Sequence, residues 1–270
     1  MRPTSETYLE RLMRDDSCSL YEFQPPDGTQ HGVVQYVAST PQSRLICNDP
    51  LVLGLQYTQS LSVACAACLK SLHAAGHIQC SERSTSVLHI LRGGLNFGLR
   101  EALGGAFAWN AHGASFLSAQ RERLPESPTE WRIVEDSYQK VYLEEVQTVV
   151  FGDVVATGTS LEHALQALLE HVVDQKAPLR EIVFFTIGGN RSTTLLKEYG
   201  EKFRSAVGSF ESCSVIYLEG IFAVPDTTTP LRIKIDGTDL LRRDSILAPE
   251  FVESQYEKPQ YALERCTIYD

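Results

Sequence analysis

One segment of the chain combines a carboxylate with small and hydroxyl-bearing residues in a pattern suited to a phosphorylated sugar. The apolar run from Val149 to Phe151 predicts a buried strand, and Asp153 comes shortly after it. A short loop follows, built from Ala156, Thr157, Gly158, Thr159 and Ser160. Apolar residues at helical spacing from Leu161 to Val172 then predict a helix, whose unpaired amides and dipole would bind phosphate. Because a carboxylate repels phosphate but accepts hydrogen bonds from hydroxyls, Asp153 predicts contact with the sugar.

Two other interpretations of this segment can be compared with the first. A Walker A loop requires the pattern G-x-x-x-x-G-K-[ST]. Gly152 and Gly158 are one residue too far apart for it, and Thr159 stands where the lysine belongs. The remaining alternative is an ordinary buried strand, turn and helix with a polar turn, and this segment alone does not exclude it.

A second segment has the same organisation of strand, polar loop and helix. An apolar strand predicted at 87–91 leads into Arg92, Gly93 and Gly94, and a helix is predicted over 95–103. Glycines let the backbone approach a ligand closely, and the planar guanidinium of Arg92 suits phosphate oxygens. The glycines do not fit the G-x-G-x-x-G register of a dinucleotide-binding loop. Two such loops in this order make coincidence a poor explanation.

Over about residues 86–175 the sequence resembles the type I phosphoribosyltransferases, which use phosphoribosyl pyrophosphate (PRPP). In their PRPP motif a strand is followed by two acidic residues, two apolar residues and a loop for the 5-phosphate. Val154 and Val155 match the apolar pair, and 156–160 match the loop. Asp153 sits at the second acidic position and Gly152 at the first. The run from Leu91 to Gly94 resembles the family's pyrophosphate loop, most closely the Leu-Arg-x-Gly version of uracil phosphoribosyltransferases.

The resemblance implies transfer of a phosphoribosyl group from PRPP to a nitrogenous base or related small acceptor, with release of pyrophosphate. It implies Asp153 as catalytic and ribose-binding, and Arg92, Gly93 and Gly94 as pyrophosphate-binding. The remaining ribose and 5-phosphate contacts would come from Val154, Ala156, Thr157, Gly158, Thr159 and Ser160. It also implies Mg²⁺ held through substrate and water without direct protein ligands, and it admits a homodimer.

Two other functions stay open at this point. Because Gly152 replaces the first acidic residue, a PRPP- or nucleotide-sensing regulatory protein of the same fold is the main alternative. An enzyme that hydrolyses or transfers a related phosphosugar is the third.

Strands alternating with helices predict an α/β fold with a central parallel sheet flanked by helices. Strands are expected at 32–38, 87–91, 107–111, 149–151, 181–187, 214–224 and 231–235. Besides those named above, helices are expected at 8–12, from 48 towards 73, and over 195–203. We expect an α/β PRPP-binding core at 61–219, in which 112–145 is a mobile loop, and a smaller variable hood from residues 1–60 and 220–270.

Composition limits the possible partners and locations. The 270 residues include 24 Lys and Arg against 34 Asp and Glu, a net charge of −10, which argues against nucleic acid or an anionic membrane surface. There is no apolar stretch of transmembrane length and no signal-peptide pattern at the amino terminus, so a cytoplasmic protein is expected. Seven scattered cysteines do not suggest a disulfide framework, and Cys65 and Cys68 are expected to be packed core thiols.

Overall fold

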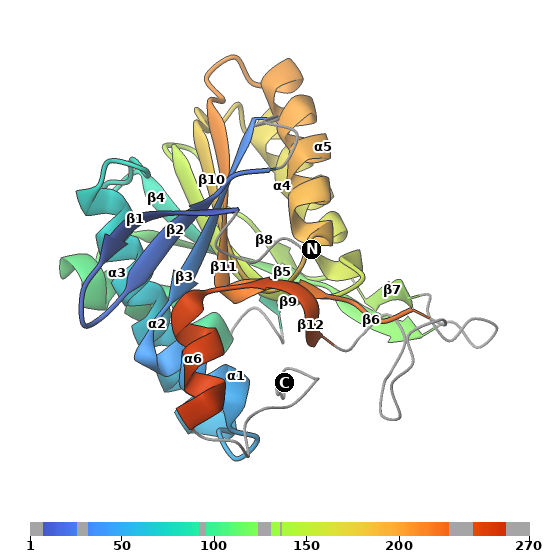
Figure 1. The fold of residues 1–270 in the computed structure, drawn as a ribbon. Coiled ribbons are helices and arrows are strands. Elements are labelled where there is room, and N and C mark those ends of the chain that lie inside the picture. Colours follow the sequence, from blue (N-terminus) through green and yellow to red (C-terminus); the bar gives the residue numbers. More distant parts are fainter. Residues whose placement is uncertain are drawn as a thin grey trace.

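The computed structural model describes residues 8–25, 32–91, 96–123, 131–135, 137–226 and 240–257 of the chain. Within these residues the main feature is a mixed ten-stranded sheet with the order β1-β2-β3-β11-β10-β9-β4-β5-β8, and β12 pairs with β11 (Figure 1). Its strands are β1 (Leu9–Arg14), β2 (Ser19–Phe23), β3 (Val33–Ser39), β4 (Thr85–Leu91), β5 (Gly113–Ser118), β8 (Gln139–Lys140), β9 (Thr148–Val155), β10 (Glu181–Gly189), β11 (Ser212–Ala223) and β12 (Leu241–Leu247).

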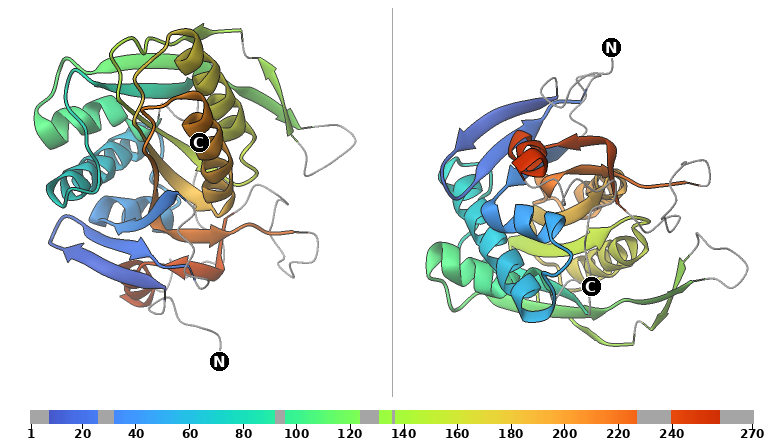
Figure 2. Two further views of the ribbon diagram at one scale, coloured as in Figure 1. Left: turned by 90° about the horizontal axis from the view of Figure 1, so that it is seen from above. Right: turned by 60° about the horizontal axis from the view of Figure 1, so that its bottom comes forward.

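The six central strands, from β3 across to β5, are parallel to one another, whereas β1, β2, β8 and β12 pair antiparallel with their neighbours. The described helices are α1 (Pro41–Asn48), α2 (Gly54–Ala74), α3 (Leu99–Phe107), α4 (Thr159–Asp174), α5 (Arg191–Ala206) and α6 (Pro249–Glu257). Helix α2 packs with α3 and α4 packs with α5, and the two pairs cover opposite faces of the sheet (Figure 2). The expected α/β architecture with a central parallel sheet is therefore present.

The core lies on both sides of the central strands. All nine residues of β10 are buried, as expected for a parallel strand covered by helices on both faces. Phe151 and Phe184 pack in neighbouring strands with ring centroids 4.8 Å apart. Cys65 and Cys68 on α2 are free and fully buried, which confirms that they are core thiols. No helix within the described residues is long and apolar enough to cross a lipid bilayer.

The order of the strands reverses between β4 and β9. From β3 the chain passes through α1 and α2 to β4, and then through α3 to the outer neighbour β5. Strand β9 lies on the other side of β4, and β10 and β11 follow in the opposite direction. Right-handed crossovers that run in opposite directions place α3 and α4 on opposite faces. Such a reversal opens a crevice at the carboxyl ends of the two strands, where open α/β sheets bind ligands.

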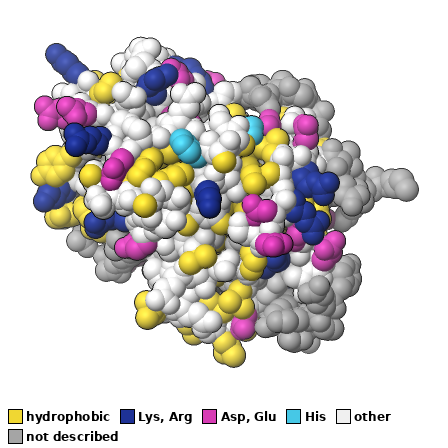
Figure 3. Space-filling model, turned by 90° about the vertical axis from the view of Figure 1, so that its left-hand side faces the viewer, with side chains coloured by type: hydrophobic (Ala, Val, Ile, Leu, Met, Phe, Trp, Pro, Cys, Tyr) yellow, Lys and Arg dark blue, Asp and Glu magenta, His cyan; other side chains and the backbone are white. Residues whose placement is uncertain are grey.

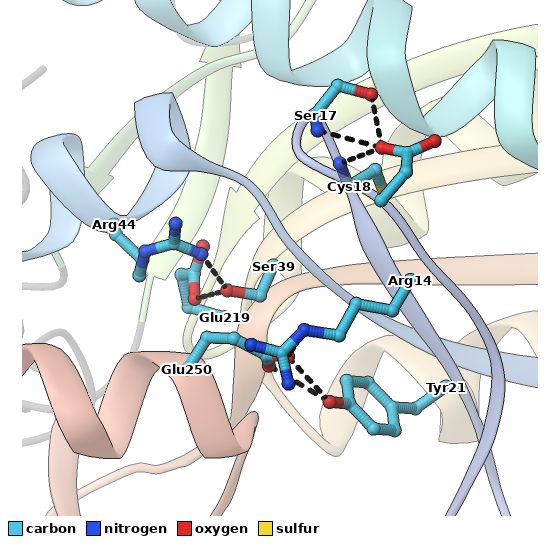
Figure 4. A network of polar contacts seen from close by, with 9 residues as sticks. Arg14, Ser17, Cys18, Tyr21, Ser39, Arg44, Glu219 and Glu250 are labelled. Carbon is cyan, nitrogen blue, oxygen red and sulfur yellow. Dashed lines mark hydrogen bonds and ion pairs between the residues drawn. The ribbon is translucent and has the colours of Figure 1, made fainter.

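The described terminal segments pack together along one margin of the sheet. The β1–β2 hairpin extends the sheet beyond β3, and α6 contacts α1. The Tyr21 hydroxyl donates to the Glu250 carboxylate, with oxygen–oxygen distances of 2.9 and 3.0 Å (Figure 4). Strand β3 lies within the segment 1–60 but pairs in the parallel sheet, so that segment contributes to the core as well as to its margin.

The segment 112–145 contains more regular structure than the sequence suggests. Strands β5 and β8 belong to the main sheet, while β6 (Gln120–Arg123) and β7 (Trp131–Glu135) form a separate antiparallel pair. This pair contacts α4 and projects beyond the sheet (Figure 1). The mobility expected of this segment stays a prediction.

Two predicted elements are wrong. The helix expected at 8–12 is strand β1, whose register shifts between Arg11 and Met13. That bulge places Leu9, Leu12 and Met13 in partly buried positions, and this spacing imitates a helical period. The strand expected at 107–111 is instead the end of α3 and the turn after it, where Ala108 adopts a left-handed conformation with φ 58°. The strand expected at 231–235 lies outside the described residues.

The helix expected from residue 48 to residue 73 is α2, which begins only at Gly54, and the separate helix α1 that ends at Asn48 was not expected. Leu51 and Leu55 at this junction are 79% and 72% exposed. The face drawn in Figure 3 likewise mixes apolar side chains with charged ones of both signs. Single exposed apolar residues are ordinary on protein surfaces and need no partner to explain them.

Candidate functional site

The strands on either side of the reversal separate before they end. Strands β4 and β9 pair only from Thr85↔Thr148 to Val87↔Val150, although β4 continues to Leu91 and β9 to Val155. The carboxyl halves of the two strands therefore diverge, which widens the crevice expected at the reversal. The β9–α4 loop, residues 156–158, follows directly. The segment that the sequence identifies as a sugar-phosphate site thus lies at the topological switch point of the sheet.

Phe97 packs directly against Gly152 of β9. Its side chain is fully buried, and a Cβ atom built on Gly152 would lie 2.7 Å from two of its ring carbons. The backbone at Gly152 does not have a positive φ. Glycine is therefore required here for space, and the position that matches the family's first acidic residue cannot carry a side chain unless Phe97 moves.

The β9–α4 loop presents the start of α4 as an anion site. Gly158 caps the helix with φ +83° and no side-chain hydrogen bond, and its carbonyl accepts the Glu162 N–H at 2.8 Å. The first amides of α4 therefore receive no side-chain cap from position 158. The hydroxyls of Thr157 and Thr159 lie 3.3 Å apart at the same place. Free amides, hydroxyls and the helix dipole together favour a phosphate group.

Asp153 lies two residues before the end of β9 and keeps 9% of its surface exposed. In the parallel register it stands beside Thr186 on β10, which stands beside Tyr217 on β11. The Tyr217 hydroxyl contacts Thr193 of α5, so this row faces the α4–α5 side of the sheet. Asp153 Oδ1 accepts the N–H of Val154 at 2.9 Å. A sugar hydroxyl would have to reach this carboxylate from the carboxyl edge of the sheet.

The neighbouring strand closes tightly against the end of β9. A Cβ atom on Gly188 would lie 2.5 Å from the Val155 carbonyl oxygen, so only glycine permits this approach. The chain then turns into α5, whose first residue, Arg191, lies close to Gly158. A Cβ atom built on Gly158 would lie 2.9 Å from Arg191 Cγ. Arg191 Nη2 is 3.5 Å from Glu162 Oε2 on α4.

Arg191 is a site residue that the sequence pattern alone did not reveal. It places a partly exposed guanidinium beside the uncapped start of α4, where it would attract an anion. The signal in the sequence is its position: it follows Gly188, Gly189 and Asn190 at the carboxyl end of the strand after the motif strand.

The predicted pyrophosphate loop cannot be compared with this geometry, because Arg92, Gly93 and Gly94 lie outside the described residues. Strand β4 leads up to them and ends at Leu91, at the crevice. Among the described residues no three His, Cys, Asp or Glu side chains are grouped so that they could hold a metal ion.

A buried histidine lies two residues before the end of β4. His89 is stacked on Phe116 with ring centroids 4.9 Å apart, and its Nε2 atom is buried without a hydrogen-bond partner in the described part of the chain. Burial, and next the charge of Arg100, lower the pKa of His89 to about 4. The imidazole is therefore neutral near pH 7 and supplies no positive charge to a phosphate.

A buried carboxyl joins the terminal segments to the carboxyl end of β11 (Figure 4). Glu219 accepts hydrogen bonds from the Ser39 hydroxyl at 2.7 Å, the Thr40 N–H at 3.1 Å and the Ser43 hydroxyl. Arg44 Nη1 donates to the Ser39 hydroxyl at 2.8 Å. Although Glu219 is not glycine, it adopts φ 68°, and burial raises its pKa to about 7. This network fixes the start of α1 against the edge of the sheet that carries the candidate site.

No protein-family model matches the sequence, and no curated protein matches it. Among solved structures, a hypoxanthine-guanine phosphoribosyltransferase of Bacillus anthracis is 18% identical, covers 48% of this chain and 69% of its own, and has a TM-score of 0.30. The enzyme of the same name from L. donovani is 13% identical, with 72% and 95% coverage and a TM-score of 0.35. The hypoxanthine phosphoribosyltransferase of Trypanosoma cruzi is 13% identical, with 73% and 94% coverage and a TM-score of 0.29. This likeness is too slight to assign the chain to a family.

Proposed function

We propose that the chain is a phosphoribosyltransferase that binds PRPP in the crevice between β4 and β9 and transfers its phosphoribosyl group to a nitrogenous acceptor. In this reaction the bond from C1 of the ribose to pyrophosphate breaks, and a bond from C1 to the acceptor nitrogen forms. The observation that carries the proposal is the placement of Asp153 and the uncapped start of α4 at the reversal of strand order.

Different residues of the site would bind different parts of the proposed substrate. The amides and hydroxyls from Thr157 to Ser160 would hold the 5-phosphate, with Arg191 beside them. The Asp153 carboxylate would accept hydrogen bonds from the ribose hydroxyls and fix the sugar at the edge of the sheet. Arg92, Gly93 and Gly94 would hold the pyrophosphate. Catalysis would then rest on positioning and on neutralising the charge of the leaving group.

A Mg²⁺ ion is part of this proposal. It would enter with the substrate, bound through pyrophosphate oxygens and ribose hydroxyls, and would supply further neutralisation of the leaving group. Asp153 would accept hydrogen bonds from those hydroxyls and would not itself be a ligand of the ion.

A non-catalytic PRPP- or nucleotide-sensing protein is the second candidate, and the packing at Gly152 favours it. Because Phe97 occupies the space of a side chain at that position, the site offers one carboxylate where the resembling family has two. Loss of a ribose contact should impair positioning of the sugar for the displacement reaction. It should affect binding of the 5-phosphate less, because that group contacts other residues.

The test is incubation with PRPP, Mg²⁺ and a panel of purine, pyrimidine and nicotinate-type acceptors, with pyrophosphate release and PRPP binding measured in parallel. Release that depends on one acceptor supports the transferase. Binding without release supports the sensor, and release of phosphate or pyrophosphate without any acceptor supports a phosphosugar hydrolase. If neither PRPP, ribose 5-phosphate nor a nucleoside monophosphate binds, the assignment of the crevice is wrong.

A further inference from the structure

A second cavity lies at the opposite end of the sheet from the β9–α4 loop. It has a volume of about 490 Å³ and includes the first residues of three neighbouring parallel strands, Thr148 of β9, Glu181 of β10 and Ser212 of β11. The connection between α2 and β4 supplies the facing wall, from Gly76 to Ser84. The volume is within the range of about 300–1,000 Å³ that is usual for small-molecule sites.

Glu181 is the buried charged group of this cavity. It lines the cavity with only 7% of its surface exposed. Its Oε2 atom accepts the Gln79 N–H at 3.0 Å, whereas Oε1 receives no donor from the described residues and opens to solvent in the cavity. Burying most of a carboxylate is costly unless hydrogen bonds compensate it. Burial raises the pKa of Glu181 to about 7, which reflects the same cost.

The other charged groups at the cavity leave it with an acidic character. Arg180 Nη2 is bound to Glu211 Oε1 at 2.6 Å, so the arginine is already compensated by a carboxylate other than Glu181. Burial raises the pKa of the Cys80 thiol to about 12, so this group is neutral near pH 7. His73 and His77 complete the titratable lining on the α2 side. Within the described residues no cation forms an ion pair with Glu181, so its charge is uncompensated when it is ionised.

The remaining lining is rich in hydrogen-bonding groups rather than apolar ones. It contributes the hydroxyls and amides of Gln79, Ser81, Ser84, Gln147, Thr148 and Ser212. A polar lining around one deep carboxylate suits a ligand with several N–H donors and a positive charge.

We propose that this cavity binds a small organic cation, a primary ammonium or guanidinium compound, whose N–H groups donate to Glu181 Oε1. The site is separate from the β9–α4 loop, since Glu181 begins the strand whose other end leads to Arg191. A ligand bound here does not occupy the crevice between β4 and β9, so it binds without competing with a sugar phosphate.

The experiment is isothermal titration calorimetry of the full chain with putrescine and agmatine, with 1,4-butanediol as a matched ligand that has the length of putrescine but no charge. The proposal expects the diamine to bind at least about tenfold more tightly than the diol. Glu181→Gln keeps the shape and the acceptor for the Gln79 N–H but removes the charge, and it should weaken putrescine binding by a similar factor. Glu170→Gln, at an exposed position of α4, removes one surface charge and should leave binding unchanged.

Proton release adds a readout that a nonspecific surface effect would not give. A bound cation favours ionised Glu181, so at pH 7 binding should release about half a proton, measured by titration in buffers of different ionisation enthalpy. Affinity should rise from pH 6 to pH 8. The proposal is overturned if putrescine and the diol bind equally, or if Glu181→Gln binds putrescine as tightly as the wild type does. It is also overturned if neither putrescine nor agmatine binds. Because the comparison of diamine with diol uses the wild-type chain, it decides the matter even if Glu181→Gln does not fold.

Discussion

Phe97 packs so closely on Gly152 that a Cβ atom at position 152 would lie 2.7 Å from its ring. The two residues belong to the two chain segments that flank the crevice, because Phe97 precedes α3 and Gly152 lies in β9. The glycine in place of the family's first acidic residue therefore has a structural cause. It makes room for the aromatic ring that packs on this face of β9.

Gly152→Ala should destabilise the protein by about 1–3 kcal/mol, since the added methyl group overpacks a rigid core contact. Thermal unfolding measures this as a lower melting temperature. Gly208→Ala is the matched control, because position 208 has nothing within 4 Å and no positive φ, and it should leave the melting temperature nearly unchanged. Equal effects of the two substitutions would contradict the packing seen at Phe97.

Gly152→Asp should not create a second ribose contact in the wild-type background, because Phe97 occupies the space that the carboxylate needs. In a protein that already carries Phe97→Ala, the added Gly152→Asp should lower stability less than it does in the wild type. The two side chains then no longer compete for the same space. The measurement is a double-mutant cycle on melting temperature. PRPP affinity measured on the same four proteins shows whether the additional carboxylate contacts substrate.

Gly158→Ala should both destabilise the protein and weaken PRPP binding. The left-handed conformation costs a non-glycine residue roughly 1–2 kcal/mol, and the Cβ would also lie 2.7 Å from Leu195 Cδ1. Gly54→Ala separates these effects, because Gly54 also has a positive φ, +55°, but nothing within 4 Å. The larger loss of stability should therefore belong to Gly158→Ala, and only this variant should lose affinity for PRPP.

The sequence was sufficient for five of the six central parallel strands, but not for β5 or for the margins of the sheet. Buried parallel strands such as β9 and β10 are continuous apolar runs, and a helix follows each at a glycine-containing turn, so local pattern and tertiary environment agree. Strand β1 was misassigned because a bulge changed its period, and the turn at Ala108 was misassigned because its aromatic neighbours resemble strand residues. In both places an irregularity of the backbone, and not the residue composition, decides the secondary structure.

The candidate site was predictable only where one segment contains all of its parts. Asp153 and the loop that follows it are adjacent in sequence, so their chemistry can be read together. Arg191 reaches the same loop from the next strand–helix unit, and Phe97 reaches Gly152 from the preceding one. Contacts of this kind depend on the order of strands in the sheet, which no local pattern contains.

Asp153→Asn should weaken PRPP binding about tenfold to a hundredfold, because each hydrogen bond to an ionised carboxylate contributes roughly 1.5–3 kcal/mol. Titration calorimetry measures the affinity, and an unchanged melting temperature without ligand shows that the fold is intact. Binding of ribose-free phosphate compounds should change little, since the loop 156–160 is untouched. Wild-type affinity for PRPP in the folded variant would show that the carboxylate is structural.

Arg191→Ala should weaken PRPP binding by about fivefold, a modest effect because the side chain is 42% exposed and screened by solvent. Arg180→Ala is the matched control, since Arg180 also forms an ion pair with a glutamate but lies at the opposite end of the sheet. Direct titration of both variants with PRPP decides the question. If both substitutions change the affinity equally, Arg191 acts only through the overall charge of the protein.

Stability should fall as the pH rises from about 6.5 to 8, because burial raises the folded-state pKa of Glu219 and of Glu181 to about 7. Below about pH 6.5 the lowered folded-state pKa of His89 adds a contribution of the opposite sign. A folded-state pKa above the unfolded value means that the native protein holds its protons more tightly. Its stabilising contribution is therefore complete below the unfolded pKa of 4.5 and is lost as the pH passes through the folded pKa. Each group contributes a slope of up to about 1.4 kcal/mol per pH unit in this window. Glu219→Gln imitates the protonated acid and should flatten the dependence of unfolding free energy on pH, measured by denaturant titration at several pH values. A slope equal to that of the wild type would show that Glu219 is already ionised in the folded protein at pH 5.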